Sequence, residues 1–485
     1  MSAPLIHIEN LSLKFHRMVV WEGLYWTINK GEQWLLTGAS GSGKTSLAKL
    51  IAKYAAQQQV QHLYVAQWFP FKDKSGTANF YYQQRYNSTE AEDCNTVWEE
   101  ISLFCHKLGK DEQDGVAILL ALDLLHRKDA ALIQLSSGEH KKLQLTKALL
   151  LQPTLLILDN PYTGLDVQTR QNLNTLINEA CTKGTTLLLV SNDGVIPEAI
   201  SHFAKLENGK FSSSTSREEE LVTPLNTEIT LPDFLNSSVL ENEEQTPFQL
   251  QQPLVELKGV HIKYGDKQVL NNITWTVNKG EKWLLHGHNG SGKSTLLSLI
   301  TGDNPQAYAN DIHLFGRKRG TGESIWDIKS RIGFISPELQ WYFEPSSTVF
   351  QTIASGFFDT AGLFRKVSEG QTEKVNQLME LFELTGQQHT LLSQLPLGKQ
   401  RLAFLARAII KNPPLLILDE PCQGLDQQQT RLFNHLVDVL CTSNRSLIYV
   451  GHFENRLPQC IQYRLGLNNG NATTLIHQLE QEITT

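Results

Sequence analysis

The motif G-x-x-x-x-G-K-[ST] occurs twice in this chain of 485 residues, and it constrains the fold more than any other feature. The second copy spans residues 287–294, follows the apolar run 283–285 and precedes a helix-like run, 295–300. In that setting the glycines let backbone N–H groups surround phosphate oxygens, and a helix N-terminus adds positive dipole. The motif therefore predicts a nucleotide site.

The first copy spans residues 38–45, and 249 residues separate Lys44 from Lys293 (293 − 44). The same offset aligns residues 15–32 with residues 264–281 without a gap, so the chain is a duplication. Thr45 and Ser294 end the two motifs with a hydroxyl that suits Mg²⁺. We expect two nucleotide-binding sets: Gly38, Ala39, Ser40, Gly41, Ser42, Gly43, Lys44, Thr45 and Ser46, and Gly287, His288, Asn289, Gly290, Ser291, Gly292, Lys293, Ser294 and Thr295.

A carboxylate ends a buried-strand pattern in each repeat. Asp159 follows four apolar residues, 155–158, and Asp419 follows the matching run 415–418. In P-loop ATPases an aspartate in this place holds Mg²⁺. A core strand ending in a solvated aspartate is the plainer alternative, but two matched copies favour a pair of metal ligands.

Phe15 and Tyr264 occupy equivalent positions ahead of the two motifs. An aromatic ring there either stacks on a nucleotide base, a contact of about 1–3 kcal/mol in other proteins, or fills the core. Position alone favours the core, so both interpretations stay open.

Composition divides the chain into three parts. Residues 1–215 and 253–485 each carry one full repeat, and residues 216–252 join them. The joining segment holds an acidic run at 218–220, several prolines and a single basic residue, Arg217. These features predict a flexible acidic linker.

Net charge and cysteine usage exclude several classes. A net charge of −7 argues against binding nucleic acid by general phosphate attraction. The six cysteines form no C-x-x-C pair, which favours reduced thiols in the cytoplasm. No run approaches the ~18 apolar residues of a membrane span, and the N-terminus lacks a signal pattern. We expect a cytoplasmic protein that acts at the inner face of the membrane only through a partner.

Two further motifs complete the pattern in both repeats. The sequence Leu-Ser-Ser-Gly-Glu at 135–139 precedes Asp159, and Gly-Leu-Asp follows at 164–166 and again at 424–426. With these motifs in order twice, the chain resembles the ATP-binding-cassette (ABC) ATPases over all but the linker. Residues 315–329 and the tandem layout are similar to the ModF-type proteins associated with bacterial molybdate transport.

The resemblance implies two α/β P-loop NTPase domains with a RecA-like core, an antiparallel β layer and a helical subdomain each. It also implies ATP and Mg²⁺ as ligands, a membrane permease as a partner chain, and head-to-tail pairing of the two domains. Each ATP would then lie between one P-loop and the signature motif of the other domain, which for the first domain includes Ser136 and Gly138.

The two repeats depart from the family pattern unequally. Glu420, the expected general base, follows Asp419, and His452 stands where the family orients the γ-phosphate and the attacking water. Asn160 and Asn192 replace them in the first repeat, and an amide cannot take a proton from water at neutral pH. The second signature motif is altered as well, and it reads Leu395, Pro396, Leu397, Gly398 and Lys399.

Head-to-tail pairing would put all these losses into one site. The site on Lys293 keeps its catalytic residues and an intact partner signature, whereas the site on Lys44 has neither. We therefore expect one hydrolytic and one nucleotide-holding site.

The family's glutamine beyond the P-loop is missing near Pro337, where Glu338 or Gln340 are candidate substitutes. In the first repeat Gln83 or Gln84 are candidates.

The sequence thus predicts an ATPase whose domain closure is coupled to a transport-associated partner, of the molybdate type by resemblance. The rival classes are an ABC switch acting on ribosomes or nucleic acid and a regulatory ATP binder. The acidic charge disfavours the first rival, and Glu420 with His452 disfavours the second.

Overall fold

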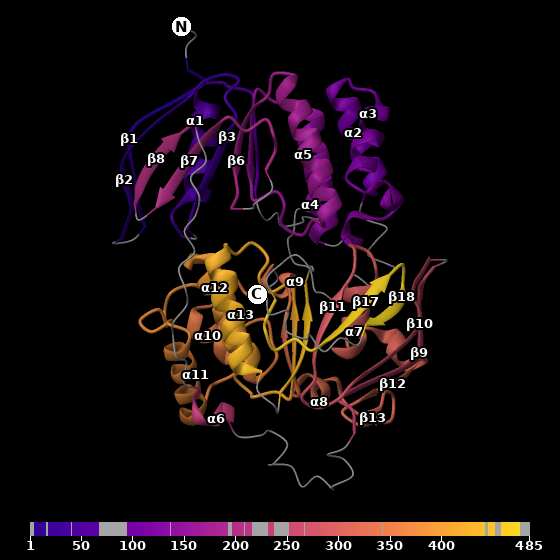
Figure 1. The fold of residues 1–485 in the computed structure, drawn as a ribbon. Coiled ribbons are helices and arrows are strands. Elements are labelled where there is room, and N and C mark those ends of the chain that lie inside the picture. The colour runs from indigo at the N-terminus through magenta and orange to yellow at the C-terminus, as the bar shows by residue number, and fades with distance from the viewer. Residues whose placement is uncertain are drawn as a thin grey trace, which may run out of the picture. The chain divides into compact units, whose positions relative to one another are not determined.

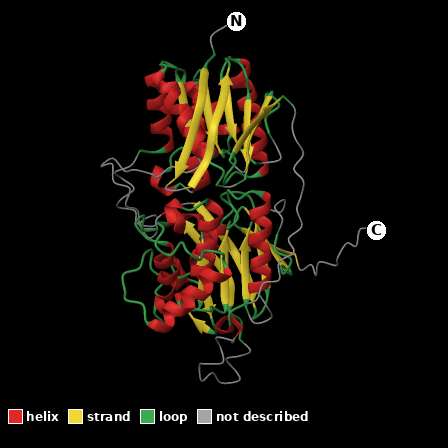
Figure 2. Cartoon of the chain, turned by 90° about the vertical axis from the view of Figure 1, so that its left-hand side faces the viewer, coloured by secondary structure: helices red, strands yellow, loops and turns green. Residues whose placement is uncertain are grey.

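The computed structural model describes residues 4–15, 18–39, 41–66, 95–135, 137–192, 196–207, 209–215, 231–236, 252–265, 267–341, 343–441, 445–451 and 457–475. The chain divides into two compact units, Met1–Thr223 and Pro224–Thr485. Each unit contains a six-stranded sheet flanked by helices (Figures 1 and 2). We describe each unit by itself.

The first unit is built on a sheet with the strand order β4-β5-β6-β3-β7-β8, parallel except for β8. The strands are β3 (Trp34–Gly38), β4 (His62–Val65), β5 (Leu155–Asp159), β6 (Thr186–Val190), β7 (His202–Glu207) and β8 (Lys210–Ser214). A separate antiparallel pair consists of β1 (Ile6–Phe15) and β2 (Met18–Ile28). The helices are α1 (Lys44–Gln57), α2 (Val97–Leu108), α3 (Glu112–Ala121), α4 (Ser137–Leu151) and α5 (Val167–Thr182).

Strand β5 is buried along its whole length because both faces of the sheet are covered. Leu155 and Ile157 pack in a core with α1 and the β1-β2 pair. Leu156 and Leu158 pack in a second core with α4 and α5. The continuous apolar run of this strand, rather than an alternating one, therefore follows from its central place.

The second unit repeats this sheet as β14-β15-β16-β11-β17-β18. Its strands are β11 (Lys282–His286), β14 (Ile332–Ile335), β15 (Leu415–Asp419), β16 (Ser446–Val450), β17 (Tyr463–Asn468) and β18 (Asn471–Leu475). Its antiparallel layer has four strands, β9 (Val255–Tyr264), β10 (Lys267–Val277), β12 (Asp311–Leu314) and β13 (Arg317–Lys318). The helices are α7 (Lys293–Ile300), α8 (Ile325–Lys329), α9 (Pro337–Trp341), α10 (Val349–Ala354), α11 (Glu369–Leu381), α12 (Leu397–Ile409) and α13 (Gln427–Leu440).

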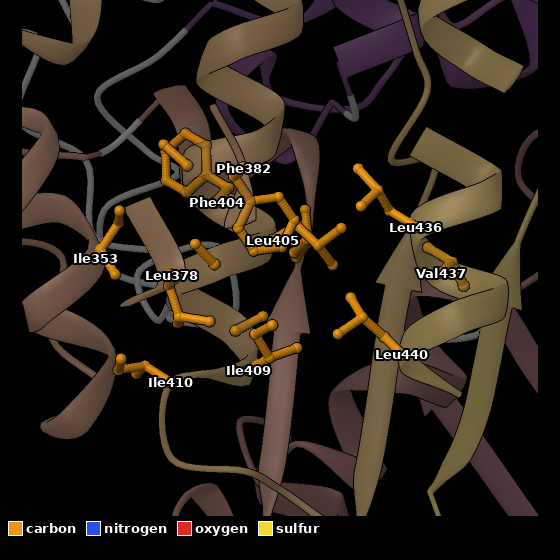
Figure 3. Packing of buried hydrophobic residues seen from close by; sticks show 14 of the residues in the cluster. Ile353, Leu378, Phe382, Phe404, Leu405, Ile409, Ile410, Leu436, Val437 and Leu440 are labelled. Carbon is orange, nitrogen blue, oxygen red and sulfur yellow. The ribbon is translucent and has the colours of Figure 1, made fainter. Parts of the chain in front are cut away.

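The helical part of each unit lies between two strands of the main sheet in sequence. It follows β4 in the first unit and β14 in the second. Helices α2 and α10 begin with capping boxes at Thr96 and Thr348, where the side chain and the third helical residue satisfy each other's free backbone N–H groups. In the second unit, side chains of α10, α11, α12 and α13 turn toward one another in a single core (Figure 3). Phe404 of α12 lies at its centre and meets Phe343 edge-on, with the ring centroids 5.3 Å apart.

A short helix inside the linker packs on the second unit. Helix α6 (Asp233–Asn236) lies beside α11 in Figure 1, and Leu235 is buried in the same core as Phe404. Asn412 Nδ2 donates to the carbonyl oxygen of Phe234 (3.0 Å), and Lys374 Nζ lies 5.3 Å from the centre of the Phe234 ring. The linker boundaries at 216 and 252 stay a prediction, since most of that segment lies outside the described residues.

The fold class predicted from the sequence is confirmed. Each unit has a mostly parallel α/β sheet, an antiparallel β layer and a helical part. Among the described residues, no helix combines the length and apolar character needed to cross a membrane.

Phe404 offers a test of the helical core of the second unit. Phe404 is 1% exposed, whereas Phe364 of the same unit is 72% exposed. Phe404→Ala should leave a cavity and lower the free energy of unfolding by about 3–5 kcal/mol. Phe364→Ala, the matched control, should change it by less than about 0.5 kcal/mol. Urea denaturation followed by a probe in the second unit measures both, and equal effects would contradict the assignment of this core.

Candidate functional site

The two P-loops have the same backbone geometry. Each runs from the end of a central strand into a helix whose N-cap is a glycine with positive φ, Gly43 (95°) in the first unit and Gly292 (106°) in the second. A Cβ on Gly292 would lie 2.7 Å from Leu270 Cδ2 and 3.0 Å from the carbonyl oxygen of Val269. Glycine is therefore required at this turn both by its φ and by the space around it.

The P-loop lysines lie over their own loops. Lys44 Nζ donates to the carbonyl oxygens of Gly38 (2.6 Å) and Ala39 (2.8 Å), and Lys293 Nζ donates to those of Gly287 (2.7 Å) and His288 (3.0 Å). Each ammonium thus closes a ring of backbone around the place where a phosphate oxygen would sit.

Both loops also contain a buried hydroxyl that suits an anion. Ser42 Oγ and Ser291 Oγ are buried, and within the described part of the chain neither has a hydrogen-bond partner. Thr45 and Ser294 are the second residues of α1 and α7, and both residues are exposed. These groups fit a bound phosphate chain with its divalent cation.

In the first unit, the aspartate at the end of β5 is surrounded by donors. Asp159 is fully buried; Tyr64 donates its hydroxyl to Oδ2 (2.9 Å), and Asn160 Nδ2 donates to Oδ1 (3.2 Å). Burial raises the pKa of Asp159, while hydrogen bonds from Thr45 and Tyr64 and the charges of Lys141 and Lys44 act in the opposite direction.

Lys141, on α4, is a buried cation whose charge acts on Asp159. It is 6% exposed, and its Nζ donates to the carbonyl oxygen of Ala66 (2.6 Å). Burial lowers the pKa of Lys141 to about 8, and the charge of Asp159 opposes that shift. Cations and neutral donors therefore outnumber acids around Asp159.

In the second unit, the matching aspartate lies among other acids. Burial raises the pKa of Asp419 well above its usual value, and repulsion from Glu338 and Glu420 raises it further, while Lys293 lowers it. Asp419 is therefore next to like charges, whereas the neighbours of Asp159 are donors and cations.

The residue after each aspartate has an unusual backbone. Asn160 and Glu420 have φ values of 46° and 43°, and their N–H groups donate to the carbonyl oxygens of Val190 (2.8 Å) and Val450 (3.1 Å). Asparagine tolerates the left-handed region, whereas glutamate rarely adopts it. Such strain is typical of functional positions.

The asparagine in place of the expected histidine is tied to the P-loop. Asn192 Nδ2 donates to the carbonyl oxygen of Gly38 (2.9 Å), and Asn192 Oδ1 accepts from the N–H of Gly38 (3.3 Å). Both ends of the amide are thus engaged by backbone. His452, its counterpart in the second unit, lies outside the described residues.

The signature motifs differ at the starts of α4 and α12. Pro396 is the N-cap of α12 and makes no side-chain capping hydrogen bond. Gly138 and Gly398 are both buried. In the first unit Glu139 pairs with Arg127 (Oε1 to Nε, 3.1 Å), while Ser136 and Ser40 lie outside the described residues.

The two candidate replacements for the missing glutamine point to different partners. The charge of Glu338 acts on Asp419, so Glu338 belongs to the acid group. Gln340 Nε2 instead donates to Gln400 Oε1 on α12 (2.7 Å).

Strands β4 and β14 pair in the same register with β5 and β15, which aligns Val65 with Ile335. The candidates of the first unit, Gln83 and Gln84, lie outside the described residues and stay predictions.

The two aromatic residues ahead of the P-loops remain predicted base contacts. Tyr264 is half-buried and packs against the core around α7, and its hydroxyl accepts from Asn304 Nδ2 (2.9 Å). The side chain of Phe15 lies outside the described residues.

Sequence reasoning missed three residues of the two sites. Tyr64 donates to Asp159 from the neighbouring strand, and the charge of Lys141, on α4, acts on Asp159 as well. Arg401, on α12, interacts electrostatically with Glu420 and Glu338. The available signal was the basic residue at the same place, two positions after each signature motif.

Comparisons with known proteins show which family the chain belongs to. A family model described as "ABC transporter" matches residues 21–163 and 270–423. The chain is 35% identical over 462 residues to the ABC transporter ATP-binding protein ModF of Escherichia coli (strain K12), covering 90% of this chain and 92% of that protein. It is 29% identical over 491 residues to an uncharacterized ABC transporter ATP-binding protein of Schizosaccharomyces pombe, covering 96% and 99%. A crystal structure of a nucleotide-free ATP-binding cassette from an ABC transporter matches 46% of this chain and 90% of that chain, at 21% identity and a TM-score of 0.38.

Proposed function

Because the chain belongs to the ABC transporter family, as an ATPase with two ATP-binding cassettes, we propose that it hydrolyses ATP in the second cassette and holds it in the first. The observation that carries this proposal is the contrast around Asp419 and Asp159. Acids including Glu420 surround Asp419, whereas Tyr64, Asn160 and Lys141 surround Asp159.

In the second cassette the side chains divide the work of hydrolysis. Lys293 binds the terminal phosphates, and backbone N–H groups of the loop hold the other phosphate oxygens. Ser294 and Asp419 would hold Mg²⁺, which would supply positive charge to the phosphate oxygens. Glu420 accepts a proton from the attacking water, and His452 orients that water.

In the first cassette the groups for ground-state binding remain. Gly38, Lys44 and Thr45 surround the phosphates, and Asp159 with Thr45 offers a site for Mg²⁺. No carboxylate follows Asp159, and Asn192 is tied to the backbone of Gly38. Binding energy without a proton acceptor lowers the ground state but leaves the barrier high, so nucleotide stays bound.

The two cassettes pair head-to-tail in this proposal. Each nucleotide then meets a P-loop from one cassette and a signature motif from the other. This arrangement gives the hydrolytic site the unaltered signature residues Ser136 and Gly138, and it gives the holding site the altered residues Pro396 and Leu397. The support for it is the family and the clustering of every departure in one of the two sites.

The cycle of closure and reopening drives a partner chain that spans the membrane. Support comes from the family and from the similarity to ModF, from which molybdate follows as the first substrate class to examine. The protein would work in the cytoplasm at the inner face of the plasma membrane, where ATP is available. A net charge of −7 supports a protein partner over nucleic acid.

Glu420→Gln tests the hydrolytic site. The amide keeps the shape of the side chain but cannot accept a proton, so turnover should fall by about 10²–10⁴-fold while ATP binding stays near the wild-type level. Steady-state ATPase assays and equilibrium nucleotide binding measure the two quantities. Asn160→Asp is the control and should change turnover little. Wild-type turnover in Glu420→Gln would show that the base is elsewhere.

Lys293→Ala tests the holding site. This change disables the second cassette, so any remaining hydrolysis comes from the first, and single-turnover cleavage should be at least about 10²-fold slower than in the wild type. Filter binding should still detect one retained nucleotide per chain. Lys44→Ala is the comparison, and it should reduce turnover less than Lys293→Ala does. ATP cleavage at near the wild-type rate in Lys293→Ala would contradict the proposal that the first cassette only holds nucleotide.

Affinity purification of the Glu420→Gln chain with ATP tests the partner. This variant should stay in the ATP-bound state and retain a multi-span membrane protein from detergent-solubilised membranes of the source cell. A Lys44→Ala, Lys293→Ala double variant is the control and should lose that protein, because it cannot bind ATP. Recovery of ribosomal proteins in place of a membrane protein would favour the rival switch function.

A further inference from the structure

Arg401 is a buried arginine in the second cassette that the hydrolytic mechanism does not use. It lies in α12, two residues after the signature motif, and is 1% exposed. Its Nη2 donates to the carbonyl oxygen of Gln423 (3.3 Å). Its Nε and Nη1 are buried without a hydrogen-bond partner among the described residues. A guanidinium in that condition loses its hydration and needs nearby negative charge to remain stable.

The compensating charges belong to the catalytic group. Burial lowers the pKa of Arg401 to about 10, and the electrostatic influence of Cys422, Glu420 and Glu338 opposes that shift. Burial also raises the pKa of the Cys422 thiol to about 12, so this thiol is uncharged at neutral pH. Glu420 and Glu338 therefore remain as the counter-charges of Arg401.

A chain of two hydrogen bonds links the same arginine to the orientation of Glu420. Arg401 holds the backbone carbonyl of Gln423, and Gln423 Nε2 donates to Glu420 Oε2 (2.9 Å). Glu420 itself is in the left-handed region, where its backbone gains nothing from intrinsic preference. Its carboxylate is thus held in place by surrounding contacts.

The first cassette has a cation at this position but lacks the glutamate and the glutamine of the hydrogen-bond chain. Lys141 occupies the position of Arg401, two residues after the signature motif, and lies near Asp159. Asn160 stands in place of Glu420, and Thr163 stands in place of Gln423. A single ammonium there bonds the carbonyl oxygen of Ala66. The buried arginine therefore occurs in the same cassette as the glutamate and the glutamine, and the cassette that lacks these two residues has a lysine in its place.

We infer that Arg401 is a positioning residue for Glu420, acting through Gln423 and through its own charge. The inference rests on the proposed role of Glu420 as the general base. It ties the signature helix α12 to the catalytic carboxylate of the same cassette, so a displacement of α12 is transmitted to Glu420. The helix that follows the altered second signature motif would then help to position Glu420 in its own cassette. This role does not require the motif to contact nucleotide.

A double-mutant cycle with Glu420 tests this inference on the full chain. Arg401→Met should lower kcat by about 10²-fold and change KM by less than about threefold, because it disturbs the base and leaves the P-loop intact. In the Glu420→Gln background the same change should alter the residual kcat by less than about twofold, since no base is left to position.

Two further variants keep the test decisive. Arg401→Lys retains the charge but not the planar fork, so kcat should fall by only about tenfold, and again only when Glu420 is present. Arg401→Lys also replaces Arg401→Met in the double-mutant cycle if Arg401→Met does not fold. Arg365→Met removes an exposed arginine from the same unit and should leave kcat unchanged.

The outcomes separate this inference from the proposed function. Equal losses from Arg401→Met or Arg401→Lys with and without Glu420 would overturn the positioning role, as would a rise in KM at constant kcat. A Glu420→Gln chain with wild-type turnover would instead overturn the proposed function itself. If Glu420→Gln loses turnover and neither Arg401 variant does, the positioning role of Arg401 is contradicted and the proposed function stands.

Discussion

A carboxylate at the end of a buried parallel strand is the constraint on which both cassettes depend. Asp159 and Asp419 end strands whose apolar residues are covered on both faces, so each charge is placed where hydration is poor. Burial raises the pKa of each carboxyl. The structure must compensate, and the two cassettes do so in different ways.

The first cassette compensates within the protein. Tyr64 and Asn160 supply hydrogen-bond donors and Lys141 supplies positive charge, so groups of the protein itself compensate Asp159. In the second cassette, Glu338 and Glu420 add negative charge beside Asp419, and Arg401 and Lys293 offset only part of it. A bound divalent cation would therefore relieve more repulsion beside Asp419 than beside Asp159. The two environments therefore support different roles for the same fold.

Because the chain is a duplication, the sequence predicted both P-loops, the fold class and the difference between Asn160 and Glu420. The shared offset of 249 residues identified both P-loops, and the matching runs 155–159 and 415–419 aligned Asn160 with Glu420. The fold class followed from the strand-loop-helix setting of those motifs. Tyr64 was not predictable in this way, because its hydroxyl reaches Asp159 only through the adjacency of β4 and β5, and strand order is a tertiary property. Helix α6 was missed for a related reason: four residues show no helical period, and their burial comes from packing against α11.

The exchange of glutamate for asparagine changes more than the chemistry of one site. Backbone hydrogen bonds hold Asn160 and Glu420 in the same left-handed conformation. That conformation costs most residues about 1–2 kcal/mol, and asparagine less. In the proposed function, the second cassette keeps its glutamate against this cost because the carboxylate would accept the proton. A holding site has no such need, so asparagine there removes backbone strain together with the base.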